Sequence, residues 1–367
     1  MKIRVAIDAR SVRPKATGVG RFTRCLIQGL QAANLPADFL LFVLRGEEEL
    51  LNVKAGNFET VAVEADYEHH PRGDWWEQLQ LPRLLQKMGV HVFHAPAYHM
   101  PWGAKCPPRV LSLHDLCAFS FPQNYSWGFR HYLRFLQGWG LRKAEQVIVP
   151  CSAMRTEVQR RFPGCSPKVS VVPYAPTLKF APEDRRQDGQ PHPDYFLAVG
   201  SIEPRKNPLF LARAYRDYCR LTNTPRPLMW VGAEGYRGKT LRSQVDKLLE
   251  GCDWKWLGWC GDDRLADLYR GAAALLFPSH YEGFGFPMVE ALAAGCRVIA
   301  SDIEVFRELD RGGTTLLTLD DYRAWAQAMA NLPKDSMPHS DHVVRRWDDV
   351  AKEIFQVYEK AAQHRRL

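Results

Sequence analysis

Two glutamates flank a short glycine-containing turn in the second half of the chain. In HYEGFGFPMVEALAAG, residues 280–295, Glu282 precedes the turn and Glu290 follows eight positions later. Pro287 is suited to the start of a helix, where its missing N–H is not needed. The turn is therefore expected at a helix N-terminus, where backbone N–H groups favour phosphate oxygens or sugar hydroxyls; these groups belong to Gly283, Phe284 and Gly285.

Both carboxylates are suitable partners for neutral sugar hydroxyls. Glu282 is expected at the mouth of the turn, and Glu290 on the first turns of the helix, where a negative charge is tolerated. The alternative is that one is a solvated loop residue and the other an ordinary helix charge. The spacing and the turn together favour a binding role.

A pair of basic residues follows a predicted strand earlier in the same half. The segment GSIEPRKN, residues 200–207, places Arg205 and Lys206 just before Pro208, which can begin a helix. Two cations at such a position suit a diphosphate. The alternative is an ordinary basic helix start.

Two further segments near predicted strand ends carry polar or glycine residues. In TGVGRF, residues 17–22, Gly18 and Gly20 would allow a loop backbone to approach an anion. The segment lacks the third glycine of a dinucleotide fingerprint, and a plain flexible loop is the alternative. In LSLHDL, His114 and Asp115 end a strand, and the imidazole could contact a bound sugar.

Other histidines and aromatic residues receive a structural interpretation. The histidines match no metal-ligand spacing, so no metal site is predicted; they are His69, His70, His91, His94 and His99. Trp75 and Trp76 are expected to pack rather than to form a stacking platform. The aromatic stretch 125–135 predicts a helix surface that could lie near an acceptor.

The elements that must position these residues alternate between strands and helices, which indicates parallel sheets covered on both faces. The first half predicts strands over 3–8, 39–43, 91–95, 109–113, 146–150 and 168–172. Helices are expected between them near 20–33, 75–88, 127–143 and 152–162. The second half predicts strands over 195–200, 227–232, 254–258, 273–278 and 296–301.

The chain length and one polar segment indicate two domains. A chain of 367 residues exceeds one simple core. The Pro-rich and charged segment 173–194 is predicted to link an N-terminal domain, 1–172, to a C-terminal domain, 195–340. Residues 341–367 predict an amphipathic helix that packs back toward the N-terminal domain. Ligands of such α/β sheets bind beyond the carboxyl ends of the strands.

Charge and cysteine content narrow the partners and the compartment. The chain has 49 basic and 41 acidic residues, a net charge of +8, which suits an anionic partner such as a nucleotide or a phospholipid surface. Nine cysteines without a CxxC pair indicate reduced thiols in a cytosolic setting. No stretch approaches the ~20 apolar residues of a membrane span, so any membrane contact is expected to be peripheral.

The chain resembles the retaining glycosyltransferases of the GT-B fold, in particular their group 1, or GT4, family. The most specific likeness is LYRGAAALLFPSHYEGFGFPMVEALAAGCRVIASD, and moderate ones are IDARSVRPKATGVGRFT, WEQLQLPRLL, FHAPAYHMP, LHDL and GSIEPRKN. The likeness covers nearly the whole chain and is greatest to bacterial mannosyl- and rhamnosyltransferases of surface polysaccharides. It implies two Rossmann-like α/β domains, each a doubly wound parallel sheet, facing across a cleft.

The resemblance also implies roles for the segments described above. Lys206 matches the family's diphosphate-binding lysine, with Arg205 beside it, and Glu290 matches the acid that holds the ribose. Glu282 would hold the sugar, helped by the amides of Phe284 and Gly285. Ser201 stands where many relatives have an arginine, so Arg205 would take over that charge.

Two contributions to the reaction are implied for the N-terminal half. Gly20 would approach the diphosphate, and His114 would touch the donor sugar near its reacting carbon. The base would lie near LGWC, residues 257–260. The implied reaction is hexosyl transfer with retention, without a metal or another cofactor.

GDP-mannose is the first choice of donor, and a UDP- or dTDP-sugar is next. The expected acceptor is a saccharide or lipid-linked saccharide at the cytoplasmic face of the plasma membrane. Three other classes of protein are alternatives. A GT-B epimerase or phosphorylase would share the fold. A nucleic-acid binder is disfavoured because the basic residues are spread along the chain. A nicotinamide-dependent oxidoreductase would need the glycine fingerprint that is missing.

Overall fold

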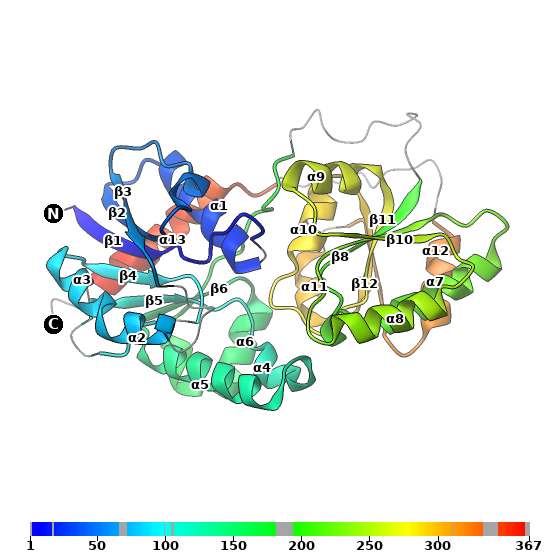
Figure 1. Ribbon diagram of the computed structural model, residues 1–367, viewed down its shortest axis with the longest axis horizontal. Helices are drawn as coiled ribbons and strands as arrows, with labels where there is room; N and C mark the ends of the chain where they lie inside the picture. The colour runs from blue at the N-terminus through cyan, green and yellow to red at the C-terminus, as the bar shows by residue number, and fades with distance from the viewer. Residues whose placement is uncertain are drawn as a thin grey trace. The chain divides into compact units, whose positions relative to one another are not determined.

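The structure is a computed structural model, and it describes residues 2–16, 18–65, 72–98, 100–103, 106–180, 194–310, 312–332 and 344–363. These residues form two compact units (Figure 1). Unit 1 comprises Met1–Leu116, Gly128–Thr177 and Arg345–Leu367, and unit 2 comprises Cys117–Trp127 and Leu178–Val344. Residues 117–127 therefore belong to unit 2, although the sequence pattern places them in the first domain. Most of the predicted linker, 181–193, lies outside the described residues.

Unit 1 is built on a seven-stranded parallel sheet with the order β3-β2-β1-β4-β5-β6-β7. The strands are β1 (Ile3–Asp8), β2 (Ala37–Leu44), β3 (Phe58–Val63), β4 (Val92–Ala95), β5 (Arg109–Ser112), β6 (Gln146–Val149) and β7 (Val169–Val171). The central strands are almost wholly buried, which explains why they are continuous apolar runs in the sequence. The strand order reverses between β1 and β4, the position where such sheets bind ligands.

The helices of unit 1 include the C-terminal one. They are α1 (Gly18–Ala32), α2 (Arg72–Leu79), α3 (Leu81–Lys87), α5 (Trp127–Lys143, whose first residue is assigned to unit 2), α6 (Ser152–Arg161) and α13 (Trp347–Gln363), with 3-10 turns η1 (Glu48–Leu51) and η3 (Pro163–Lys168). The predicted helix 75–88 is two helices, because Pro82 begins a new one.

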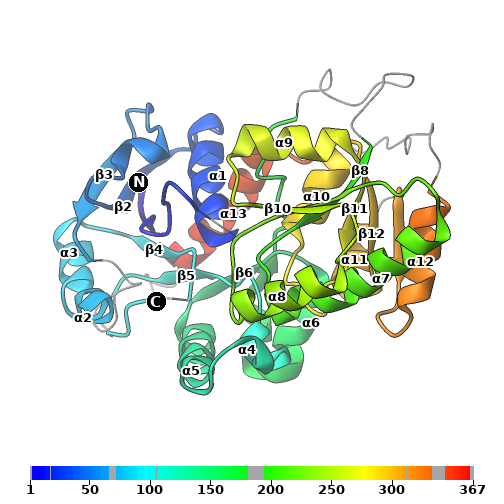
Figure 2. The same cartoon turned by 45° about the vertical axis from the view of Figure 1, so that its right-hand side comes forward.

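Helix α13 lies beside α1 and against the sheet, as Figures 1 and 2 show in red and blue. The Trp347 indole N–H donates to the Pro176 carbonyl at 2.8 Å. The Tyr358 hydroxyl lies 2.8 Å from His94 Nδ1, and His94 Nε2 lies 2.8 Å from Ser112 Oγ. This buried chain of polar contacts ties the last helix to two strands of the sheet.

Unit 2 has a six-stranded parallel sheet with the order β10-β9-β8-β11-β12-β13. The strands are β8 (Tyr195–Val199), β9 (Leu228–Val231), β10 (Trp254–Gly258), β11 (Ala272–Phe277), β12 (Arg297–Ser301) and β13 (Thr314–Leu317). The order reverses between β8 and β11, which pair side by side in the middle of the sheet. The two strongest sequence motifs follow these two strands.

Helices cover both faces of this sheet, as in a doubly wound fold (Figure 1). Helices α7 (Pro208–Leu221), α8 (Gly238–Leu248) and α12 (Tyr322–Ala330) form one group. The other group is α9 (Asp262–Gly271), α10 (Phe286–Ala293) and α11 (Glu304–Leu309). Short elements complete the unit: α4 (Cys117–Ser120), η2 (Pro122–Asn124) and η5 (Pro204–Lys206). The predicted class, two Rossmann-like parallel-sheet domains, is confirmed.

Among the described residues, no helix has both the length and the apolar character to cross a bilayer.

Candidate functional site

The loops after β8 and β11 meet at the switch point of unit 2. The β8 loop carries Arg205 and Lys206, and the β11 loop carries Glu282, 76 residues away from Lys206 in the sequence. Because β8 and β11 are neighbouring parallel strands, their carboxyl ends lie at the same edge of the sheet. The fold therefore brings together three of the residues that the sequence singled out.

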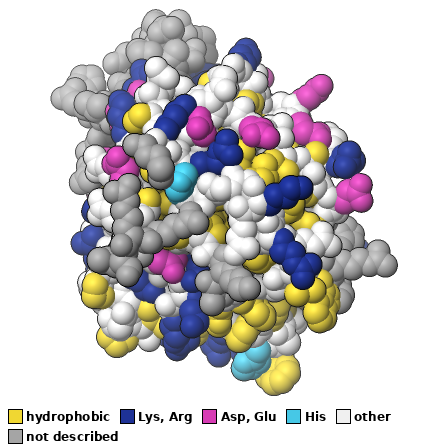
Figure 3. All heavy atoms as spheres, turned by 90° about the vertical axis from the view of Figure 1, so that its left-hand side faces the viewer, with side chains coloured by type: hydrophobic (Ala, Val, Ile, Leu, Met, Phe, Trp, Pro, Cys, Tyr) yellow, Lys and Arg dark blue, Asp and Glu magenta, His cyan; other side chains and the backbone are white. Residues whose placement is uncertain are grey.

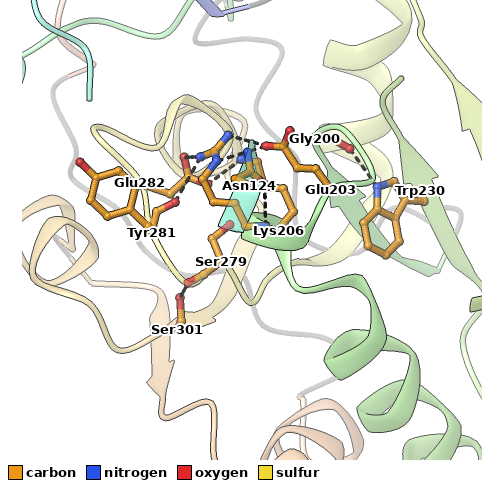
Figure 4. Close-up of polar contacts among 10 residues, drawn as sticks. Asn124, Gly200, Glu203, Lys206, Trp230, Ser279, Tyr281, Glu282 and Ser301 are labelled. Atoms are coloured by element: carbon orange, nitrogen blue, oxygen red, sulfur yellow. Dashed lines mark hydrogen bonds and ion pairs between the residues drawn. The ribbon is translucent and has the colours of Figure 1, made fainter. Parts of the chain in front are cut away.

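Glu282 forms an ion pair with each of the two cations (Figure 4). Its Oε1 accepts from Lys206 Nζ at 2.6 Å, and its Oε2 accepts from Arg205 Nη1 at 2.7 Å. The carboxylate is buried, with 7% of the residue exposed. The structure thus corrects the expectation of a carboxylate at the mouth of the turn, since Glu282 lies inside and holds the basic pair.

Arg205 is fixed from several directions. Glu203 Oε1 accepts from its Nε at 3.1 Å and from its Nη2 at 2.8 Å, and the Tyr281 carbonyl accepts from Nη1 at 3.1 Å. The Arg205 backbone N–H donates to Asn124 Oδ1 at 3.1 Å. Two carboxylates and two cations therefore balance one another, and the guanidinium orientation is set before any ligand binds.

Lys206 is buried, which is unusual for a lysine because its ammonium group normally stays in water unless it is paired. Its side chain is 10% exposed, and Nζ lies 4.7 Å from the centroid of the Phe277 ring. Burial lowers the pKa of Lys206, and the nearby Glu282 charge opposes that effect. Burial alone would raise the pKa of Glu282, but the Arg205 and Lys206 charges outweigh it and hold that pKa below its ordinary value. The pair is therefore a preformed charged site.

The Gly283–Gly285 turn leads into α10, as predicted. Gly285 has φ +100°, in the left-handed region, and a Cβ there would lie 2.8 Å from Cε1 of Phe306. The fold itself thus requires glycine at this position. Phe284 is buried, with its ring against Phe286 at a centroid distance of 5.2 Å. A binding role for this turn stays a prediction.

Glu290 lies on the buried face of α10. It is 1% exposed, and its Oε2 accepts from the Tyr269 hydroxyl of α9 at 3.1 Å. A buried carboxylate is costly unless it is hydrogen-bonded, so its presence needs a reason beyond surface charge. Ser201 lies in the loop that follows β8, directly after Gly200, and is half-buried. Its role as a donor-binding residue also stays a prediction.

The glycine-containing segment of unit 1 is helical, so the expected loop is wrong. Helix α1 begins at Gly18, and Thr17 lies outside the described residues. A Cβ at Gly20 would lie 2.3 Å from the Ser11 carbonyl oxygen, so close packing of α1 on the β1 loop already requires glycine. Gly18 is exposed and has open space around it. The first amides of α1 remain the candidate contact with an anion.

His114 lies at the end of β5, in a site formed by unit 1 itself. Its Nε2 is 2.7 Å from the Pro96 carbonyl, which can only accept, so Nε2 carries the proton. Nδ1 is then free to accept from the Tyr174 hydroxyl at 3.3 Å. The ring also contacts Phe22 edge-on at 4.7 Å. Burial lowers the pKa of His114 to about 4, so the imidazole is neutral at neutral pH.

The lowered pKa of His114 predicts a loss of stability in acid. Between pH 6.5 and about 4 the unfolded chain binds a proton at this position that the folded chain does not, so lowering the pH favours unfolding. The expected cost is roughly 3 kcal/mol between pH 7 and pH 4. Urea unfolding at several pH values should show this slope in the parent and a shallower slope in His114→Gln. Equal slopes in both proteins would contradict the assignment.

Four residues that contact the candidate residues were not identified from the sequence: Glu203, Asn124 and Tyr281 contact Arg205 in unit 2, and Tyr174 contacts His114 in unit 1. Glu203 lies inside the GSIEPRKN motif, where a carboxylate two positions before an arginine was an available signal. Asn124 lies 81 residues before Arg205, and nothing in its local sequence connects the two. Its segment also stacks Phe121 on His280 with a centroid distance of 5.2 Å.

Replacing Asn124 by alanine is expected to loosen the basic pair. The Arg205 N–H would lose its partner in a buried position, which costs about 1–3 kcal/mol of unfolding free energy. The apparent affinity for a nucleoside diphosphate should fall several-fold, measured by calorimetry. Asn57→Ala is the matched control, because Asn57 also makes a side-chain to backbone bond, to Ala37 in unit 1. Equal diphosphate affinities for the two variants would show that Asn124 has no role in diphosphate binding.

Comparisons with known proteins match both halves of the chain to glycosyltransferase family models. The family model "Glycosyl transferases group 1" matches residues 180–347, and "Glycosyltransferase Family 4" matches residues 16–175. Among curated proteins, the O-antigen chain mannosyltransferase B of Escherichia coli is 23% identical over 330 residues, or 84% of each chain. The O-antigen chain mannosyltransferase RfbU of Salmonella typhimurium is 26% identical over 242 residues, or 65% of each chain.

A solved structure shares the fold over almost the full length. The sucrose-phosphate synthase of Thermosynechococcus elongatus superimposes with a TM-score of 0.71 at 18% identity, and the match covers 98% of this chain and 99% of the other. At this identity the likeness bears on the fold only.

Proposed function

We propose that this glycosyltransferase, whose two halves match the group 1 and family 4 models, moves a hexosyl unit from a nucleotide sugar to a saccharide or lipid-linked saccharide acceptor in surface polysaccharide synthesis. GDP-mannose is the proposed donor, supported by the two O-antigen mannosyltransferases among its relatives. A UDP- or dTDP-sugar is the next choice. The proposed location is the cytoplasm, at the inner face of the plasma membrane.

The observation that carries the proposal is the buried Arg205–Lys206–Glu282 cluster at the β8/β11 switch point. Cleavage of the bond between the anomeric carbon and the diphosphate leaves negative charge on the nucleoside diphosphate. Lys206 and Arg205, already oriented by Glu282, would stabilise that charge without reorganisation. The proposal assigns the stabilisation of this charge to the two side chains and to the Gly283–Gly285 amides, and it includes no metal or other cofactor.

The remaining residues would position the sugar and the nucleotide. Glu290 would hold the ribose, and Glu282 with the amides of Phe284 and Gly285 would border the sugar. Gly283, Ser201, Gly18 and Gly20 would complete the diphosphate contacts. His114 would face the reacting carbon as a neutral imidazole. The acceptor hydroxyl would attack from the face that the diphosphate leaves, which retains the anomeric configuration.

Two measurements test this function. Thermal-shift screening with GDP, UDP and dTDP should raise the melting temperature most with the nucleotide of the true donor. Incubation of that donor sugar with a saccharide acceptor should then yield a glycoside with the donor's anomeric configuration, read by NMR. An inverted product would reject retention. A donor that is epimerised without any acceptor would replace the transferase with a GT-B epimerase.

A further inference from the structure

Large apolar side chains gather on α2, on α5 and on the segment between these helices. Nine large hydrophobic side chains of the described residues are exposed, and six of them lie between residues 75 and 135. Their exposed fractions run from 42% to 73%. We call this set the aromatic surface; its members are Trp75, Leu79, Trp102, Trp127, Phe129 and Phe135. Trp75 was expected to pack and Leu79 and Trp102 were not singled out, whereas the other three belong to the stretch 125–135 that predicts a helix surface; an exposed patch of this kind marks an interaction site.

Trp102 joins the parts of this surface. Its backbone N–H donates to Gln78 Oε1 of α2 at 2.7 Å. Its ring contacts two rings of α5, those of Phe135 at 5.5 Å and Trp139 at 5.4 Å between centroids. Trp75 and Leu79 lie one turn apart on the same α2 helix as Gln78. The six side chains are thus presented by α2, α5 and the segment between them.

The helix that carries half of this surface is strongly basic. Over its 17 residues, α5 has no Asp or Glu; its cations are Arg130, Arg134, Arg142 and Lys143. Trp127, His131 and Phe135 follow at intervals of four residues and are all exposed, so they lie on one outward face. Figure 3 shows hydrophobic side chains beside Lys and Arg along the lower edge, where α5 lies.

The helix dipole accounts for only some of the cations of α5. Cations in the last turn complement the helix dipole, which explains Arg142 and Lys143. It does not explain the two arginines in the first half of α5, or the protruding rings. The sequence interpretation of spread-out basic residues is therefore incomplete, because α5 combines clustered cations with aromatic rings.

We propose that the aromatic surface docks on an anionic lipid membrane. Aromatic side chains favour the headgroup level of a bilayer, and interfacial helices combine them with Lys and Arg. The negative surface of anionic lipids attracts the cations of α5. A nucleic acid fits less well, because its phosphates would need exposed cations, whereas Arg130 and Arg134 are half-buried and Leu79 and the exposed rings offer apolar contact. The biological purpose, reaching a lipid-linked acceptor, rests on the proposed function.

Vesicle binding by the full chain tests the proposal without any sugar donor. Co-sedimentation would compare vesicles of phosphatidylcholine alone with vesicles containing about 30% phosphatidylglycerol, whose charge attracts basic segments. Binding to the anionic vesicles should be at least about tenfold tighter and should weaken with salt. Equal binding to both, or none to either, would overturn the proposal.

Matched variants locate the surface. The double variant Trp127→Ala/Phe135→Ala should weaken vesicle binding at least about tenfold, through loss of buried apolar area. Lys143→Glu should weaken it about fivefold or more, through loss of charge attraction. The controls are Leu221→Ala, an equally exposed apolar residue of α7, and Lys247→Glu, a lysine in the last turn of α8. Both should bind as the parent does; equal losses in the controls would reject the assignment.

Three other outcomes would also decide what the aromatic surface binds or whether the proposed function holds. Salt-sensitive binding of single-stranded RNA or DNA that Trp127→Ala/Phe135→Ala abolishes, without vesicle binding, would assign the surface to nucleic acid. Concentration-dependent dimers lost in the same variant, again without vesicle binding, would assign it to a second copy. Vesicle binding by a chain that transfers no sugar to a free acceptor would support the membrane surface while rejecting the proposed function.

Discussion

Replacing Lys206 by methionine is expected to lower kcat/KM for the donor about 10²–10³-fold, close to the loss of one preorganised charge partner in an active site. Methionine fills nearly the same volume below Gly200 and against Phe277, but it carries no charge. Glu282 would keep one ion pair, to Arg205 at 2.7 Å. The leaving diphosphate would lose the ammonium group of a buried lysine. Steady-state kinetics with the nucleotide sugar identified by thermal shift would measure this.

A matched control separates this effect from instability. Arg226 is also a buried cation; it is ion-paired to Asp194 and lies 5.9 Å from the Phe196 ring, but beside the amino ends of the unit 2 strands. Arg226→Met should cost stability and leave kcat/KM within about threefold, because distant sites are nearly independent. Lys206→Met/Glu282→Gln should regain melting temperature without regaining turnover. If Arg226→Met lost as much activity as Lys206→Met, the cluster would be structural only.

The motifs of the donor half were predictable because their positions follow from strand order. Each of the two motifs comes directly after an apolar run, and the two runs became β8 and β11. Parallel α/β sheets place such loops at one edge, so Lys206 and Glu282 were expected near one another. Their direct ion pair was not predicted, because spacing along the chain says which loops meet but not which atoms do.

The missed elements have physical reasons of their own. Strands β3 and β13 lie at the edges of their sheets, and both expose part of their residues. A search for continuous apolar runs finds buried central strands and passes over half-exposed edges. Gly18 and Gly20 were assigned to a loop because glycine allows a loop backbone to approach an anion closely. In the structure, Gly20 allows α1 to pack closely on Ser11, a tertiary requirement that local sequence does not reveal.

Replacing Glu290 by glutamine is expected to raise the donor KM about 10–100-fold, the cost of losing a hydrogen bond from a charged group to a ribose hydroxyl. Glutamine keeps the size of the side chain, and its Oε1 can still accept from the Tyr269 hydroxyl that now lies 3.1 Å from the carboxylate. The fold should therefore be largely retained, so circular dichroism and the melting temperature should change little. Donor titrations by calorimetry would give the same ratio as KM if the loss is in binding.

Tyr269→Phe supplies the complementary test, because it removes the internal hydrogen bond and leaves the carboxylate. It should cost about 1.5–3 kcal/mol of unfolding free energy and change the donor KM less than about threefold. A ligand role for Glu290 predicts opposite patterns: affinity lost with stability kept in Glu290→Gln, and stability lost with affinity kept in Tyr269→Phe. A carboxylate that only braces α9 against α10 predicts that neither variant alters donor affinity, since the contact would be internal to unit 2. Comparing the donor affinities of the two variants therefore decides whether Glu290, which is 1% exposed, binds the donor or only stabilises the fold.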